Sequence, residues 1–227
     1  MKKTTMILMS LVLACSMIFM SACRSRLSEG IEQDRKWRVV KEFDLKEAKS
    51  EEQGFHYPGT QWGDTVGGLQ QSIGVTVSKV AGYGENNIVF YQADTLRTMI
   101  LGRTSDGATI GCAGDKVYMI SFVFEDDSEY ASVISQPDLR DQYVAKMTEE
   151  YGEPTNYEKT EKVISEVKNY YESWFWDAET PDGKSTQIQF ATASTFPGGD
   201  PAYMSLGVVW LMDDVVELLD DESGEEE

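Results

Sequence analysis

The chain has one histidine, His56, and three cysteines, Cys15, Cys23 and Cys112, in 227 residues. One histidine and the one thiol left after processing cannot supply the usual ligand set of a zinc site, so the sequence disfavours zinc. Ser-His and Cys-His mechanisms would all depend on His56 as the base, and no Gly-x-Ser-x-Gly motif is present. We therefore expect His56 to be structural or exposed, and we expect no metal, cofactor or catalytic residue.

Basic residues are also few, since 20 Lys and Arg stand against 39 Asp and Glu, and the net charge is −19. Proteins that bind nucleic acid neutralise phosphates with Lys and Arg, so this balance argues against nucleic acid as a partner. It also disfavours flat adhesion to anionic lipid. It favours solubility, loosely held cations or a basic partner.

The N-terminus has the order of a secretory signal. Two lysines follow Met1, residues 6–20 are uncharged and rich in Leu, Ile, Val and Met, and two small residues precede Cys23. This order predicts export from the cytoplasm.

Met20-Ser21-Ala22-Cys23 resembles the lipobox of bacterial lipoproteins, with Met where that motif usually has Leu. The resemblance implies that residues 1–22 are a cleaved signal peptide and that Cys23 carries acyl chains such as palmitate. Cleavage removes two lysines and no acid, so the net charge of the mature chain becomes −21. The expected location is the extracytoplasmic face of a cell membrane, with a lipid anchor.

Two alternatives to this anchor stay open. Residues 4–23 are uncharged and long enough to span a bilayer as an uncleaved helix. Arg24 and Arg26 follow directly and blur the charge asymmetry that orients such helices. Plain secretion is the other alternative.

Cys112 would be the one free thiol of the processed chain, so no intramolecular disulfide can form and stability must come from core packing. Cys112 lies between Gly111 and Ala113 at the end of an expected strand. A free cysteine in such a setting behaves as a small hydrophobe, so we expect it to be buried and inert.

Charge patterns divide the chain into segments. Residues 23–54 are densely charged with mixed sign, and we expect a lipidated tether there. Residues 37–45 within it are apolar enough to be a first edge strand instead. Residues 55–212 should be the globular domain. Residues 213–227 include nine acids and no basic residue, which predicts a partly disordered acidic tail.

Two helices are predicted. The first begins after Asp64, its expected N-cap, and ends at Gly74, with apolar residues at helical spacing between them. The second spans about 138–151, with Ser135 as the cap and Gly152 as the stop. Its apolar residues recur every four positions on one face.

Strands are predicted over seven segments, with a hairpin between the first two and a charged loop between the second helix and residue 167. In the fourth segment the even residues Tyr118, Ile120, Phe122 and Phe124 should face the core. The segments are 88–94, 96–102, 109–112, 117–125, 167–177, 185–193 and 203–212.

These elements predict an α+β fold with an antiparallel sheet and two packed helices. Each helix ends in a glycine and precedes about three strands, which suggests a pseudo-repeat of helix plus three strands. Residues 55–64, followed by a helix, a glycine and a meander, resemble the opening of β-lactamase-inhibitor-protein-like and small outer-membrane-assembly lipoprotein modules. The resemblance implies a non-catalytic domain that presents a sheet face or loops to another protein.

Two further groups of residues are candidate sites. Trp62, Tyr170, Trp174 and Trp176 are core residues by alternation, or a binding surface if they are exposed. Acidic residues 126–129 and the tail offer oxygen ligands for calcium, without EF-hand spacing.

The sequence therefore favours a membrane-anchored lipoprotein that acts as a non-enzymatic binding or interaction module of the cell envelope, with a protein or glycan partner. The alternatives are a carbohydrate- or peptidoglycan-binding module and a hydrolase that uses a pair of carboxylates.

Overall fold

The computed structural model describes residues 40–83, 88–100, 103–105, 107–125, 139–164, 167–194, 203–212 and 215. The chain divides into two compact units, of which the larger is Val40–Trp210. The other unit contributes residues 211, 212 and 215 to this description. Among the described residues, no helix is long and apolar enough to cross a membrane.

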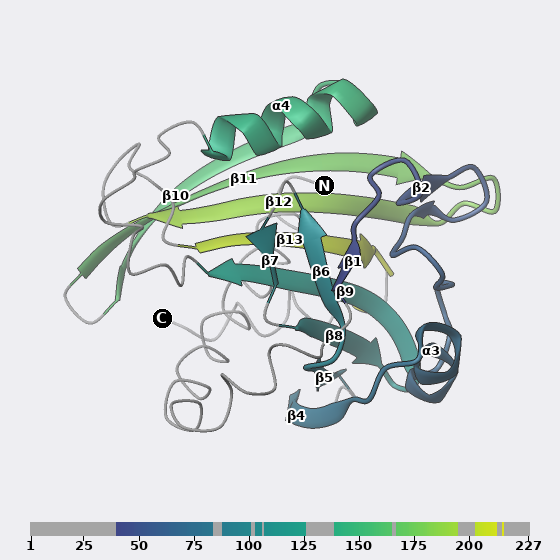
Figure 1. The fold of residues 1–227 in the computed structure, drawn as a ribbon. Helices are drawn as coiled ribbons and strands as arrows, with labels where there is room; N and C mark the ends of the chain where they lie inside the picture. Colours follow the sequence, from purple (N-terminus) through teal and green to yellow (C-terminus); the bar gives the residue numbers. More distant parts are fainter. Residues whose placement is uncertain are drawn as a thin grey trace. The chain divides into compact units, whose positions relative to one another are not determined.

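The main feature of the Val40–Trp210 unit is an antiparallel sheet of eight strands in the described part of the chain (Figure 1). Its spatial order is β10-β11-β12-β13-β9-β8-β5-β4. In chain order the strands are β4 (Ser78–Tyr83), β5 (Ile88–Ala93), β8 (Ala108–Ala113), β9 (Lys116–Glu125), β10 (Asn156–Ile164), β11 (Val167–Glu179), β12 (Ser185–Ser194) and β13 (Tyr203–Trp210).

Two smaller sheets accompany it. Strand β1 (Val40–Glu42) pairs in parallel with β6 (Arg97–Ile100), which pairs with β7 (Arg103–Thr104). Strands β2 (Lys49–Ser50) and β3 (Gly54–Phe55) form a short antiparallel pair. The fold is thus α+β and mostly antiparallel, as predicted.

Helix α3 (Val66–Ile73) begins one residue later than predicted. Thr65 is the N-cap, because its Oγ1 accepts the N–H of Gly68 at 3.1 Å. Gly74 ends the helix with φ of 69°, as its lack of a side chain permits. Asp64, the expected cap, instead uses its carbonyl to accept the N–H of Val117 at 2.8 Å.

Helix α4 (Leu139–Tyr151) lies over β11 and β12 (Figure 1). Tyr143 is buried and stacks on Phe190 of β12, with ring centroids 5.2 Å apart. Met147 is buried in the same core. The four-residue spacing of the apolar side chains therefore does place this face on the sheet.

One face of the large sheet carries the main core. Of the four residues of β9 that were predicted to face it, three belong to this core: Ile120, Phe122 and Phe124. Tyr118 differs, because β8 and β9 are out of register beside it. Tyr118 is the extra residue of a β-bulge, so Val117 takes the core position. The Tyr118 ring instead lies over Gly111, where a Cβ would come within 3.0 Å of it.

The predicted hairpin of 88–94 and 96–102 is wrong. Strand β5 pairs with β4 and β8, whereas β6 leaves the large sheet and pairs with β1 and β7. The N–H of Leu96 closes a turn on the carbonyl of Ala93 at 3.0 Å, and the Leu96 side chain is buried. Local pattern indicates that both segments are extended, but it does not choose their partners.

The predicted charged loop before residue 167 is also wrong, because it contains β10, which pairs with β11 over its whole length. The folded unit also begins earlier than the expected start near Phe55. Phe43 and Ala48 are buried in the main core, so the chain from Val40 belongs to the unit. The expected helix cap Ser135 lies outside the described residues.

Strand β3 is joined to β12 by one threonine. Thr186 is fully buried, and its Oγ1 accepts the N–H of Phe55 at 2.8 Å. Gly54 has φ of 63°, and a Cβ on it would lie 2.1 Å from that same Oγ1. A side chain at position 54 would therefore break the joint as well as strain the backbone.

We expect Gly54→Ala to lower the free energy of unfolding by about 3 kcal/mol, from left-handed strain, the steric clash and the lost hydrogen bond. Gly183→Ala is the matched control, because Gly183 has φ of 84° and nothing within 4 Å of its Cβ position. That variant should lose only about 1 kcal/mol. Urea denaturation measures both, and equal losses would contradict this account of β3.

Candidate functional site

Two of the four aromatic residues of the candidate binding surface belong to the core. Trp62 and Trp176 are buried, and their indole N–H groups donate to backbone carbonyls. Trp62 Nε1 donates to the carbonyl of Phe55 at 2.7 Å, and Trp176 Nε1 donates to the carbonyl of Gly152 at 2.8 Å. Their ring faces and polar atoms are already in use, so they do not offer a sugar-stacking surface.

Trp174 and Tyr170 are half-buried on the same strand, β11. Trp174 stands between two rings, Phe190 at 5.7 Å on one side and Tyr157 at 5.3 Å on the other. Tyr157, on β10, is 47% exposed. The core thus continues as a row of aromatic rings that reaches the surface at Tyr157.

His56 and Cys112 are both buried. The ring nitrogen Nδ1 of His56 lies 3.1 Å from the carbonyl of Gly54, which fixes the ring beside β3. Burial and then the nearby Asp115 raise the pKa of the Cys112 thiol to about 12. Cys112 is therefore a thiol at neutral pH rather than a nucleophilic thiolate.

Several predicted sites lie outside the described residues, namely Cys23, the acidic residues 126–129 and most of the tail. Within the part of the chain that the structure describes, no three His, Cys, Asp or Glu side chains lie close enough together to hold a metal ion.

Sequence reasoning missed a charged cluster around Glu172 of β11, because two of its members lie on the strand that was predicted as a loop. The Glu172 carboxylate accepts a hydrogen bond from Tyr157 Oη at 2.7 Å and one from Lys159 Nζ at 3.1 Å. Arg140 of α4 contacts it at 2.7 Å. The cluster thus joins α4, β10 and β11.

The cluster holds Glu172 in its charged form. Burial opposes ionisation, but the hydrogen bonds from Tyr157 and Lys159 and the charge of Arg140 together lower the pKa of Glu172 below its ordinary value of 4.5. A general acid needs a raised pKa at neutral pH. Glu172 is therefore a structural anion rather than a proton donor for hydrolysis.

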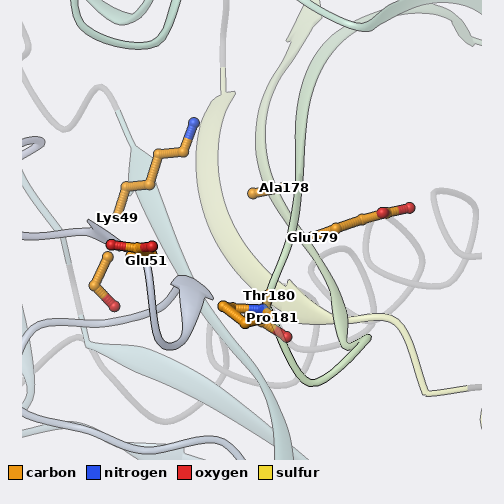
Figure 2. A pocket seen from close by; sticks show the side chains of 7 residues that line it. Lys49, Glu51, Ala178, Glu179, Thr180 and Pro181 are labelled. Carbon is orange, nitrogen blue, oxygen red and sulfur yellow. The ribbon is translucent and has the colours of Figure 1, made fainter.

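An open hollow of about 650 Å³ lies beside the β11–β12 turn (Figure 2). Its lining residues are Lys49, Ser50, Glu51, Ala178, Glu179, Thr180 and Pro181. Figure 2 shows the side chain of Glu179 extended away from Lys49 and Glu51. The two carboxylates do not point toward one another, so the hollow lacks the converging pair that a glycoside hydrolase needs.

The face of the sheet opposite the main core has a polar row. Gln189 pairs with Gly207, which pairs with Ser121. Ser121, Gln189 and Ser173 are buried, and each has a side-chain polar atom without a hydrogen-bond partner in the described region.

Comparison of the chain with family models, with curated proteins and with solved structures finds no match to any of them.

The charged cluster makes a testable contribution to stability. We expect Glu172→Gln to lower the free energy of unfolding by about 1 kcal/mol at pH 7, a value reduced for partial exposure. Because the pKa of Glu172 is lowered in the fold, its stabilisation is present above pH 4.5 and is lost as the pH falls through the folded-state value. The difference between variant and parent should therefore shrink at pH 3.

Urea denaturation at the two pH values measures this difference. Glu149→Gln is the control, because Glu149 is an exposed acid of α4 that pairs with Lys146 alone among the described basic residues. It should change stability little at either pH. An equal effect of the two substitutions would show that the cluster is only a surface ion pair.

Proposed function

We propose that this chain is an extracytoplasmic lipoprotein and that its α+β domain is a non-enzymatic binding module of the cell envelope. The anchor is lipid on Cys23, supported by the order of basic start, apolar segment and Met20-Ser21-Ala22-Cys23. Residues 24–39 then connect this cysteine to the folded unit that begins at Val40. They serve as the tether.

The observation that carries the binding role is the exposure of large apolar side chains on β10. Tyr157 and Val163 are 47% and 64% exposed, although valine is among the residue types most often buried and tyrosine is intermediate. Tyr157 also rests on Trp174 and donates to Glu172, so its ring is held in place before a partner arrives. A pre-ordered aromatic side chain loses little entropy on binding.

The sheet order supports a pseudo-repeat in a modified form. Helix α3 precedes β4, β5, β8 and β9, and helix α4 precedes β10, β11, β12 and β13. Each set of four is an antiparallel meander, and the two meet at the β9–β13 pair. We therefore propose a repeat of a helix and four sheet strands, with β6 and β7 as an excursion from the first.

A carbohydrate- or peptidoglycan-binding module is the second candidate. The exposed ring of Tyr157 favours it, because aromatic side chains at the surface can stack on apolar sugar faces.

The anchor is tested with Cys23→Ala and the matched variant Cys112→Ala. Cys23→Ala should abolish incorporation of labelled fatty acid and release or mislocalise the protein. Cys112→Ala should keep both the label and the location, since Cys112 is buried in the fold. A parent chain that stays in the membrane uncut and without the fatty-acid label would instead establish the uncleaved transmembrane helix.

The binding role is tested with a photo-crosslinking amino acid at position 157, activated in the native envelope. We expect a discrete protein adduct from this position and none from position 149, which is exposed on α4. A sugar-containing adduct would favour the glycan-binding candidate. Equal labelling from both positions would count against a binding surface on β10.

A further inference from the structure

The two edges of the large sheet differ in their fitness to pair with another strand. Strand β4 has a register irregularity between Lys79 and Ala81, which disturbs its hydrogen-bonding edge. Strand β10 is regular over nine residues and pairs only with β11 among the described strands. A regular edge strand is a template for a further strand.

The side chains of β10 are arranged symmetrically about Thr160. Among the described residues, the exposed large hydrophobic side chains are Val80, Tyr157 and Val163, and the last two lie three residues before and after Thr160. The charged residues between them also mirror each other in sign, since an acid on one side matches a lysine on the other.

We propose that β10 pairs antiparallel with β10 of a second copy of this chain, about a two-fold axis at Thr160. The two large sheets then form one continuous sheet, and the interface uses the same surface on both copies. The facing residues are Tyr157 with Val163, Glu158 with Lys162, Lys159 with Glu161, and Thr160 with itself.

Charge selects this register over its neighbours. A two-fold axis perpendicular to the sheet places one residue of β10 opposite its own copy. Shifting the axis by one residue sets Lys159 against Lys159, or Glu161 against Glu161, and like charges directly opposite each other are destabilising. Shifting the axis by two residues sets Glu158 against Glu158, or Lys162 against Lys162. The register centred on Thr160 avoids all four repulsions.

The charges needed for pairing are free of ion pairs on one face of β10 in the described part of the chain. On the other face they are already paired within the chain, where Glu161 contacts Lys168 at 2.6 Å. On one face, no ion pair within the described part of the chain involves Glu158 or Lys162, so both can pair across the axis. On the other face, Lys159 already contacts Glu172 at 3.1 Å. It would then lie between Glu172 and Glu161 of the second copy, which extends the charged cluster into the interface.

Helix α4 leaves room for the second copy. Its contacts are with Glu172 of β11 and Phe190 of β12, so its axis lies about two strand spacings from the proposed two-fold axis. With strands about 4.8 Å apart, the two copies of α4 would be roughly 20 Å apart. Packed helices approach to about 8–10 Å, so the helices do not collide.

Disulfide trapping tests the position of the axis in the purified full-length protein. Directly opposite residues have Cα atoms about 4.5–5.5 Å apart, which a disulfide can span. Thr160→Cys should therefore give a covalent dimer under mild oxidation. Glu158→Cys is the matched control, because its copy would lie roughly 14 Å away in this register. Mass spectrometry of the linked peptide identifies the bond.

A charge swap tests the pairing by a route independent of cysteine. Lys162→Glu places two acids opposite each other at two symmetric positions and should weaken dimerisation about tenfold, measured by sedimentation. The double variant Glu158→Lys, Lys162→Glu restores the opposite charges and should recover parental dimerisation. Circular dichroism confirms that each variant is folded.

The proposal is overturned if Thr160→Cys gives no dimer, if Glu158→Cys links equally well, or if the double charge swap fails to recover dimerisation. Because pairing uses β10 alone, it does not depend on the proposed anchor. It rests on the proposed binding role of β10 and names the partner as a second copy of this chain, so an adduct of position 157 to a different protein would support the binding role and contradict the pairing. A Cys23→Ala chain that is released from the membrane but still gives the Thr160→Cys dimer separates the two outcomes.

Discussion

Tyr151 at the end of α4 joins three parts of the fold that are distant in sequence. Its ring packs edge-on against Phe55 of β3 and Trp176 of β11, with ring centroids 5.0 Å and 6.4 Å away. Its hydroxyl donates to the carbonyl of Leu45 at 2.6 Å. The N-terminal segment, the helix and the sheet are thus held by one half-buried phenol. Burial, followed by nearby acids, raises the pKa of Tyr151, so it stays a neutral donor.

Cys112 is the one cysteine among the described residues, and it is a buried free thiol, so no disulfide joins the described parts of the domain. The domain therefore depends on contacts between aromatic rings. Phe43 packs on Tyr57 and Phe122, and Tyr143 stacks on Phe190. These contacts bury the N-terminal segment and α4 on the same face of the sheet. Packing of large rings therefore supplies the cohesion that disulfides provide in many small exported domains.

The same aromatic row explains why an exposed ring and a charged cluster lie together at one edge of the sheet. It leaves the core through Phe190 and Trp174 and ends at Tyr157, where Arg140, Lys159 and Glu172 form a charged cluster. Packing of Tyr157 on Trp174 and the contacts of Tyr157 and Lys159 with Glu172 make β10 an ordered edge strand. The local sequence resembles a loop, because charged residues occupy both faces of the strand. Only its hydrogen bonds to β11 make it a strand.

The sequence by itself determined the α+β class, the extents of the apolar strands and the burial of Cys112, because alternation, helical spacing and glycine stops are local signals. It also carries the Cys23 motif on which the proposed anchor rests. The tertiary structure decided which strands pair, that Val40 to Gly54 joins the core, and that Val117 replaces Tyr118 there. Each of these depends on contacts between residues far apart in the chain, which no local pattern specifies.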